Sequence, residues 1–290
     1  MKSPAPASRV EGDAVMRSEP LLVTSCMAPV AERFVQALAE LIGRRLAIET
    51  RFVHEIPWQQ REQWLDEGRV QMGWICGLPY VWKVDHAPDA PPAADLALLA
   101  APVFAATRYE GRPVYFSDVV VRADSPFQNF EQLRGASWAY NERRSHSGFW
   151  LTRYHLALRD LNGDFFGRVV GAGSHERALE LILAGEIDAA AIDSTVLELV
   201  LEQEPAWTQK VRVLESWGPS PAPPWLVHRR APAGLREALR ALLLQMHEDE
   251  EGRAVLQLAR LARFVAVGDE DYDPIRQMAR RAQAITLGER

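Results

Sequence analysis

The chain has 290 residues, of which 48% are hydrophobic and 25% charged, and its formal net charge is −6. Such a composition is ordinary for a globular protein that buries a core, and the length favours two lobes of roughly 100 to 150 residues. The acidic balance argues against nucleic acid as a partner, so a negatively charged ligand would have to be attracted locally.

The first segment, residues 1–20, contains Lys2 and Arg9 but no apolar core of a secretory signal, and we expect a disordered tail there. The expected location is the cytoplasm if the chain acts as written. It is the periplasm, or another extracytoplasmic space, if an export signal is missing. No stretch reaches the roughly eighteen apolar residues that a membrane-spanning helix needs.

From residue 21 short β-rich runs alternate with amphipathic helical patterns, which is typical of βα units around a mainly parallel sheet. A turn is predicted at residues 77–80 and a proline-rich loop at 86–94. The other elements expected in this first part are strands at 21–25, 46–53, 71–76 and 96–104, and helices at 29–42 and 59–66.

We expect the chain to cross from the first lobe to the second at residues 108–112. A strand at 211–217 is predicted to lead it back to the first lobe. The elements expected between the crossings are strands at 114–121, 137–140, 168–172 and 189–193, and helices at 147–159, 175–184 and 194–202. After the return we expect a strand at 225–228 and helices at 235–247, 250–261 and 274–284. The first lobe is therefore predicted to comprise 21–110 and 213–290, and the second lobe 111–212.

Polar residues gather where the predicted second-lobe strand at 137–140 meets the next helix. Ligands of open parallel sheets bind beyond the carboxyl ends of the strands, where helix starts present free N–H groups. Here Ser145 and Ser147 supply hydroxyl donors, Gly148 allows close backbone approach, and Arg143 and Arg144 add positive charge. This pattern also fits a plain serine cap, which stabilises a helix by about 1 kcal/mol without a ligand.

Four further residues have both a binding and a structural interpretation. His175 begins a helix and is able to donate to an oxyanion, or simply to bond with nearby backbone. Asp193 is a helix cap, or a partner for a protonated or amino-bearing ligand. Tyr80 and Tyr115 offer a ring and a hydroxyl to a cleft, or pack in the core.

Cys26 and Cys76 are the two cysteines of the chain. They are too few for a disulfide scaffold and lack the spacing of a zinc site. We therefore expect neither a metal nor a cofactor.

Together these motifs resemble the phosphate/phosphite/phosphonate-binding proteins of ABC importers. The resemblance runs from about residue 21 to 217 and follows the order 77–80, 115–125, 145–148, 173–175 and 188–193. It implies an α/β, type II periplasmic-binding-protein-like fold, whose two lobes are mainly parallel sheets flanked by helices and joined by two hinge strands.

The resemblance also implies roles for individual residues. Ser145, His146 and Ser147 fall on a Ser-Thr-Ser turn that grips phosphonate oxygens, with His146 in place of the usual threonine. His175 and Asp193 fall on cleft positions, and Tyr80 and Tyr115 on aromatic contacts. Several tryptophans near the expected cleft leave room for an aromatic or bulkier ligand, namely Trp74, Trp150, Trp217 and Trp225.

The leading hypothesis is a solute-binding protein that closes on a phosphonate, phosphate ester or related oxyanion and presents it to an ABC permease or a sensor. No catalytic residue is predicted, and a monomer is the expected state. One alternative is a cytosolic enzyme resembling chorismate dehydratase or naphthoate synthase of menaquinone biosynthesis, with His146 or His175 as base. Another is a ligand-sensing subunit that docks a partner through residues 260–290.

Overall fold

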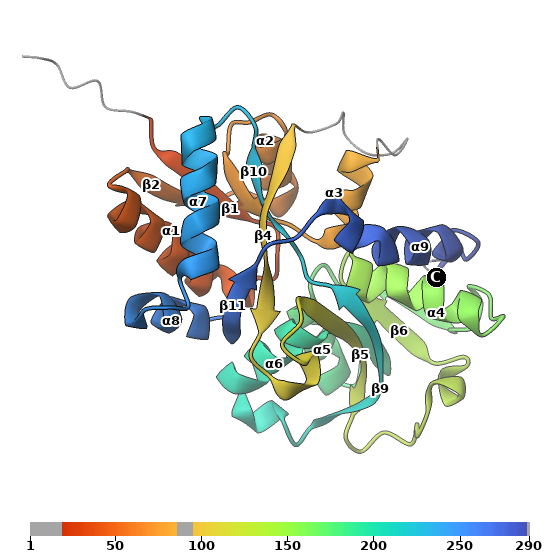
Figure 1. Cartoon of the computed structure of the whole chain (residues 1–290). Coiled ribbons are helices and arrows are strands. Elements are labelled where there is room, and N and C mark those ends of the chain that lie inside the picture. The colour runs from red at the N-terminus through yellow and green to blue at the C-terminus, as the bar shows by residue number, and fades with distance from the viewer. Residues whose placement is uncertain (1–18, 86–94, 289–290) are drawn as a thin grey trace, which may run out of the picture.

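The computed structural model describes residues 19–85 and 95–288 of the chain. The tail predicted at 1–20, apart from its last two residues, and the loop predicted at 86–94 lie outside the described part. Within that part the chain builds two mixed sheets, each covered by helices (Figure 1), and we call the portion built on each sheet a lobe. Among the described helices none is both long and apolar enough to cross a membrane.

The first lobe is built on a six-stranded sheet in the order β11-β4-β10-β3-β1-β2. Strand β1, beside the edge strand β2, pairs in parallel with β2 and β3, whereas β10 runs antiparallel between β3 and β4. The strands are β1 (Leu21–Ser25), β2 (Thr50–Val53), β3 (Met72–Trp74), β4 (Leu96–Phe104), β10 (Trp225–His228) and β11 (Leu261–Val265).

Helices cover both faces of this sheet, and large apolar side chains fill the space beneath them. Phe34 lies edge-on to Trp74, which stacks on Trp225 with ring centroids 5.6 Å apart. These tryptophans are therefore core residues of the first lobe. The helices are α1 (Glu32–Leu46), α2 (Trp58–Asp66), α3 (Gly77–Val84), α7 (Ala233–Gln245) and α8 (Glu250–Gln257).

Three predictions for this lobe were wrong in detail. The predicted turn at 77–80 is the first turn of α3, where Pro79 fits because its missing N–H lacks a helical partner anyway. Helix α1 does not stop near Gly43 but runs to Leu46, and Ala47 ends it in the left-handed conformation, so the strand predicted at 46–53 begins only at Thr50. Strand β11 lies where the sequence predicted the end of a helix and loop.

The second lobe is built on a five-stranded sheet in the order β7-β6-β8-β5-β9. Strand β6 pairs in parallel with β7 and β8, and β5 runs antiparallel to β8 and β9. The elements are β5 (Val114–Arg122), β6 (Ser137–Tyr140), α4 (Leu151–Leu158), β7 (Arg168–Gly171), α5 (His175–Leu183), β8 (Ala189–Asp193), α6 (Ser194–Gln203) and β9 (Val211–Pro221).

Two strand connections join the lobes side by side. The chain enters the second lobe from β4 into β5 and leaves it from β9 into β10, and β5 and β9 are paired with each other. Arg108, on the short turn before β5, donates to both carboxylate oxygens of the fully buried Asp118 at 2.7 and 2.9 Å. Ser216 on β9 donates to the same carboxylate at 2.6 Å. These bonds fix the two connections to each other.

A third segment crosses between the lobes, beyond the two crossings that the sequence predicted. Helix α9 (Asp273–Ala282) follows β11 and lies against α3 and α4 (Figure 1). Ile275 packs in the core of the first lobe, whereas Ile285 and Leu287 pack in the core of the second. The predicted lobe boundaries remain a proposal, and strand pairing and packing suggest assigning 211–221 and 285–288 to the second lobe.

Candidate ligand-binding site

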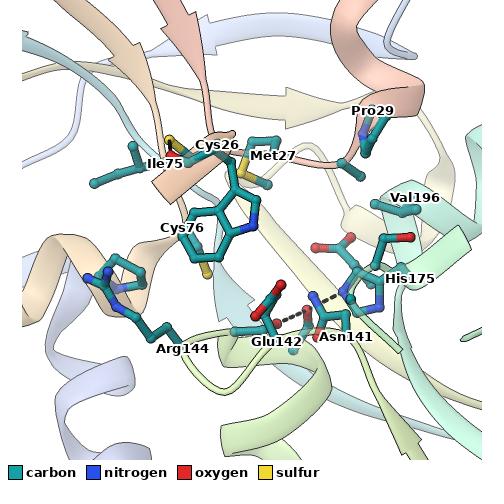
Figure 2. Close-up of a pocket in the computed structure, with 18 of the residues that line it drawn as sticks. Cys26, Met27, Pro29, Ile75, Cys76, Asn141, Glu142, Arg144, His175 and Val196 are labelled. Atoms are coloured by element: carbon teal, nitrogen blue, oxygen red, sulfur yellow. Dashed lines mark hydrogen bonds between the residues drawn. The ribbon is translucent and has the colours of Figure 1, made fainter. Parts of the chain in front are cut away.

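A cavity of about 170 Å³ lies between the two lobes. Figure 2 shows Cys26, Met27 and Ile75 of the first lobe on one side, facing Asn141, Glu142 and His175 of the second. On the second-lobe side the wall is formed by residues at the start of three helices, the segments 141–147, 173–176 and 193–196. The cavity therefore lies where the expected binding crevice of an open sheet would be.

Ser145 and Ser147 stand at the first of these helix starts. The chain makes a π-helical turn over His146–Trp150 before α4, and the Ser145 Oγ accepts from the Gly148 N–H at 3.1 Å. The two hydroxyl oxygens are 3.3 Å apart. An added Cβ on Gly148 would lie 2.0 Å from the Asn141 Oδ1, so only glycine allows this close approach.

His175 and Asp193 bring the other two helix starts to the cavity. Gly173, with φ at +86°, makes the left-handed turn that leads into α5, and the His175 Nε2 lies 3.0 Å from the Ser147 Oγ. Asp193 caps α6, where its Oδ1 accepts from the Thr195 N–H at 2.9 Å and from the Thr195 hydroxyl at 2.7 Å. The hydroxyls, the imidazole and the carboxylate thus face one hollow.

A buried ion-pair network closes one side of the cavity across the lobes. Glu62 on α2 is 3% exposed and accepts from both terminal nitrogens of Arg144 at 2.9 and 3.0 Å. The Lys83 Nζ contacts Glu62 at 2.9 Å and Asp66 at 2.5 Å. Two cations therefore balance two carboxylates, and Arg144 of the second lobe is held by the first.

Burial sets the charge of the titratable groups at the cavity. It lowers the pKa of His175 to about 3, so this imidazole is neutral at physiological pH. It raises the pKa of Asp193 to about 6, against the hydrogen bonds from Thr195 that favour the carboxylate. Buried polar atoms without a protein partner among residues 19–85 and 95–288 also lie on cavity residues: Asn141 Oδ1, His175 Nδ1, Glu176 Oε2 and Arg61 Nε.

Comparison with known proteins assigns the chain to a family. The family model described as "ABC transporter, phosphonate, periplasmic substrate-binding protein" matches residues 22–272. The chain belongs to this family. It is 26% identical over 217 residues to the phosphonates-binding periplasmic protein of Escherichia coli K12, a match that covers 73% of this chain and 60% of that relative's length.

Solved structures agree on the fold of this phosphonate-binding family member. A binding protein component of an ABC phosphonate transporter from Pseudomonas aeruginosa superposes with a TM-score of 0.79 at 16% identity, over 92% of this chain and 87% of that one. PhnD1 from Prochlorococcus marinus, solved with methylphosphonate, gives 0.76 at 17% identity, over 91% and 98%. The predicted two-lobed, type II periplasmic-binding-protein fold is confirmed. The prediction of mainly parallel sheets was wrong, because β4, β10 and β11 in the first lobe and β5 and β9 in the second pair antiparallel.

The structure brings together four of the seven predicted site residues, since Ser145, Ser147, His175 and Asp193 all line the cavity. The other three are not among the lining residues. Their ligand-contact role, like that of the first four, stays a prediction in this member of the phosphonate-binding family.

The three outlying residues have structural partners, and for Tyr115 these include the site residue Ser147, with which it shares a side-chain hydrogen bond. Tyr80 donates to Asp269 at 2.8 Å and packs edge-on against Tyr272. Tyr115 is 1% exposed in the first-lobe core, and His146 is fully buried with its Nε2 3.1 Å from the Ser220 Oγ.

Sequence reasoning missed most of the first-lobe wall of the site, although it expected the segment 77–80, which contains the lining residue Pro79, to contribute Tyr80. That wall follows the carboxyl ends of β1 and β3 and one face of α2, and its residues are Cys26, Met27, Ala28, Pro29, Trp58, Arg61, Glu62, Ile75, Cys76 and Pro79. The segment after β1 was detectable by the same strand-end rule that found Ser145. The α2 residues carried no such signal. Among the described residues no group of three or more potential ligands is placed to hold a metal ion.

We expect the free energy of unfolding to fall as the pH drops from about 6.5 towards 3. Burial lowers the pKa of His146, His155 and His175 to about 3 in the folded protein, so below pH 6.5 the unfolded chain binds protons that the folded chain does not. Asp193, with its pKa raised to about 6, acts in the opposite direction between about pH 6 and 4, and the raised pKa values of Asp66, Glu142 and Glu198 have the same sign. The three imidazoles have the larger effect, because each of their pKa values falls from 6.5 to about 3.

Urea unfolding at pH 7.0 and 4.5 measures this difference. His155→Gln removes one of the three imidazoles with a lowered pKa; it is partly buried and lies outside the cavity, and its loss should reduce the pH dependence. A wild-type stability that is unchanged or higher at pH 4.5 would contradict the argument.

Proposed function

We propose that this protein binds a small phosphonate, phosphate ester or related oxyanion between its lobes and presents it to the permease of an ABC importer. The observation that carries the proposal is the convergence of Ser145, Ser147 and His175, at two helix starts, on one cavity between the lobes. Helix starts carry partial positive charge and free N–H groups, which suit an anion. PhnD1, the structural relative solved with methylphosphonate, supports this choice of ligand.

The transport partner and the location follow from the family. Its model describes a periplasmic substrate-binding protein of an ABC transporter, and the curated relative from Escherichia coli is a periplasmic protein. We therefore propose an extracytoplasmic location and a permease partner for this chain.

Binding without chemistry fits the site better than the enzyme alternative does. A general base works best when its pKa lies near the working pH, and burial lowers the pKa of both His146 and His175 to about 3. His146 also lies outside the cavity lining and contacts Ser220. Family membership supports the same choice.

The docking surface expected for the sensor alternative is partly engaged within the fold. The segment 260–288 supplies β11 to the first sheet and α9 to the contact between the lobes. Arg260 pairs with Glu198 and Glu202 of α6. Much of this segment is therefore engaged within the fold.

Titration with methylphosphonate tests the proposal. At a ligand concentration 100 times the dissociation constant, the free energy of unfolding should rise by about 2.7 kcal/mol, because the ligand binds only the folded state. Mass spectrometry of the incubated ligand should show no turnover. Acetate at the same concentration is the control anion. An absence of stabilisation by methylphosphonate, other alkylphosphonates and phosphate esters would contradict the proposed function.

A further inference from the structure

Arg61 is a buried cation on the cavity wall. The proposed oxyanion site at Ser145 and Ser147 gives it no role. It lies on α2 of the first lobe, is 7% exposed, and lines the cavity. The serines, by contrast, belong to the second lobe. A ligand held between the lobes would therefore meet Arg61 from the side opposite the serines.

The guanidinium of Arg61 is poorly paired within the protein. Its Nε is a buried atom with no hydrogen-bond partner anywhere in the described ranges 19–85 and 95–288. It forms one ion pair, in which a terminal nitrogen lies 3.4 Å from the Glu32 Oε1, and the Glu32 side chain is 32% exposed. A guanidinium has five N–H donors, and a buried charge that lacks partners is destabilising.

The adjacent carboxylate does not supply the missing partner. Glu62 follows Arg61 directly in the sequence but is committed to Lys83 and to both terminal nitrogens of Arg144. The group of Glu62, Asp66, Lys83 and Arg144 is balanced in charge by itself. Arg61 is thus left with a cationic face on a cavity whose wall also includes apolar Met27, Ile75 and Pro79.

We propose that Arg61 recognises a second anionic group on the ligand, so that the preferred ligand class is a phosphonate bearing a carboxylate. The planar fork of arginine matches the two oxygens of a carboxylate. In surroundings that are partly apolar such a bond is stronger than in water. This inference rests on the proposed function, because it takes the phosphonate itself to be held at Ser145 and Ser147.

The cavity also contains acidic side chains, which define the competing ligand class. Glu176 accepts from the Val30 N–H at 3.2 Å through one oxygen, while its other oxygen is buried without a partner in the described part of the chain. Burial raises the pKa of Glu142. An ammonium group on the ligand would suit these carboxylates, so an amino-bearing phosphonate is the comparison that the experiment needs.

Three ligands with the same phosphonate and two-carbon spacer separate the possibilities by isothermal titration at pH 7.5. Propylphosphonate ends in a methyl group, 3-phosphonopropionate in a carboxylate and 2-aminoethylphosphonate in an ammonium. We expect wild type to bind 3-phosphonopropionate about tenfold more tightly than propylphosphonate, the ratio of one added charge-assisted hydrogen bond. In Arg61→Met that preference should disappear, because the affinity for 3-phosphonopropionate falls about tenfold further than the affinity for propylphosphonate does.

Arg61→Lys keeps the charge without the fork and serves as a second variant if Arg61→Met does not fold. It should retain only part of the preference for the carboxylate. The inference is overturned if wild type prefers the methyl or ammonium ligand, if the variants keep the full preference, or if they lose affinity equally for both anions. Wild type that binds none of the three ligands would instead overturn the proposed function, and the inference with it.

Discussion

Lys83→Met is expected to lower the free energy of unfolding by about 3 to 5 kcal/mol, the usual effect of removing one partner from a buried ion pair. Lys83 is 1% exposed, and its ammonium lies 2.9 Å from Glu62 and 2.5 Å from Asp66. Methionine keeps the length and the apolar stem of the side chain but leaves two buried carboxylates facing each other with Arg144 alone. Urea unfolding at pH 7.5 measures the loss.

Two comparisons test the cause of this loss. Arg44→Met breaks an ion pair with Glu251 whose side chains are 55% and 51% exposed, so it should cost less than about 1 kcal/mol. The deficit of Lys83→Met should also shrink as the pH falls, because burial already raises the pKa of Asp66 and a protonated carboxyl needs no cation. Equal losses in the two variants would show that burial of the network contributes nothing.

Ser147→Ala is expected to weaken methylphosphonate binding by about 1 to 3 kcal/mol, or roughly 5- to 150-fold in the dissociation constant. The Ser147 Oγ lies 3.3 Å from that of Ser145 and 3.0 Å from the His175 Nε2, so it stands between two groups on residues that line the same cavity. Its loss removes one donor to the ligand. It also takes away the partner of the His175 Nε2, whose ring already has an unpaired Nδ1 in the described structure.

Ser137→Ala is the matched control for this substitution. Ser137 lies on β6 of the same lobe, and its hydroxyl pairs with Asp188 at 2.6 Å rather than with the cavity. Its removal should leave the dissociation constant unchanged. Titration calorimetry that finds equal affinity in Ser147→Ala and wild type would remove Ser147 from the site.

Periodicity made most of the fold predictable, and the failures have physical causes. The strands at 21–25, 137–140 and 189–193 have the bounds that the sequence predicted, because buried β-rich runs are bordered by polar or helix-starting residues. Strand β11 escaped prediction because Leu261–Val265 follows a helix with no glycine or proline between them. The placement of α9 against both lobes is a matter of tertiary packing, which no local pattern encodes.

The site was predictable mainly on the second-lobe side. Ser145, Ser147, His175 and Asp193 follow the ends of strands, and that rule locates a binding crevice without any knowledge of packing. Arg61 and Glu62 lie instead on the buried face of α2 beside Leu65. Charged residues on a helix predict a solvent-exposed face. The hydrophobic pattern of α2 therefore could not show that this face forms the first-lobe wall of the cavity.

Helix α9 limits how far the two lobes can move apart. Rotation about β5 and β9 alone would pull this helix away from α3 or α4, since it contacts both. Uncovering a side chain such as Ile275, which is fully buried, carries a penalty of about 1.5 to 3 kcal/mol. Helix α9 thereby favours the closed arrangement of the lobes even without a ligand. For the proposed function, this would raise the affinity for the ligand and slow its release.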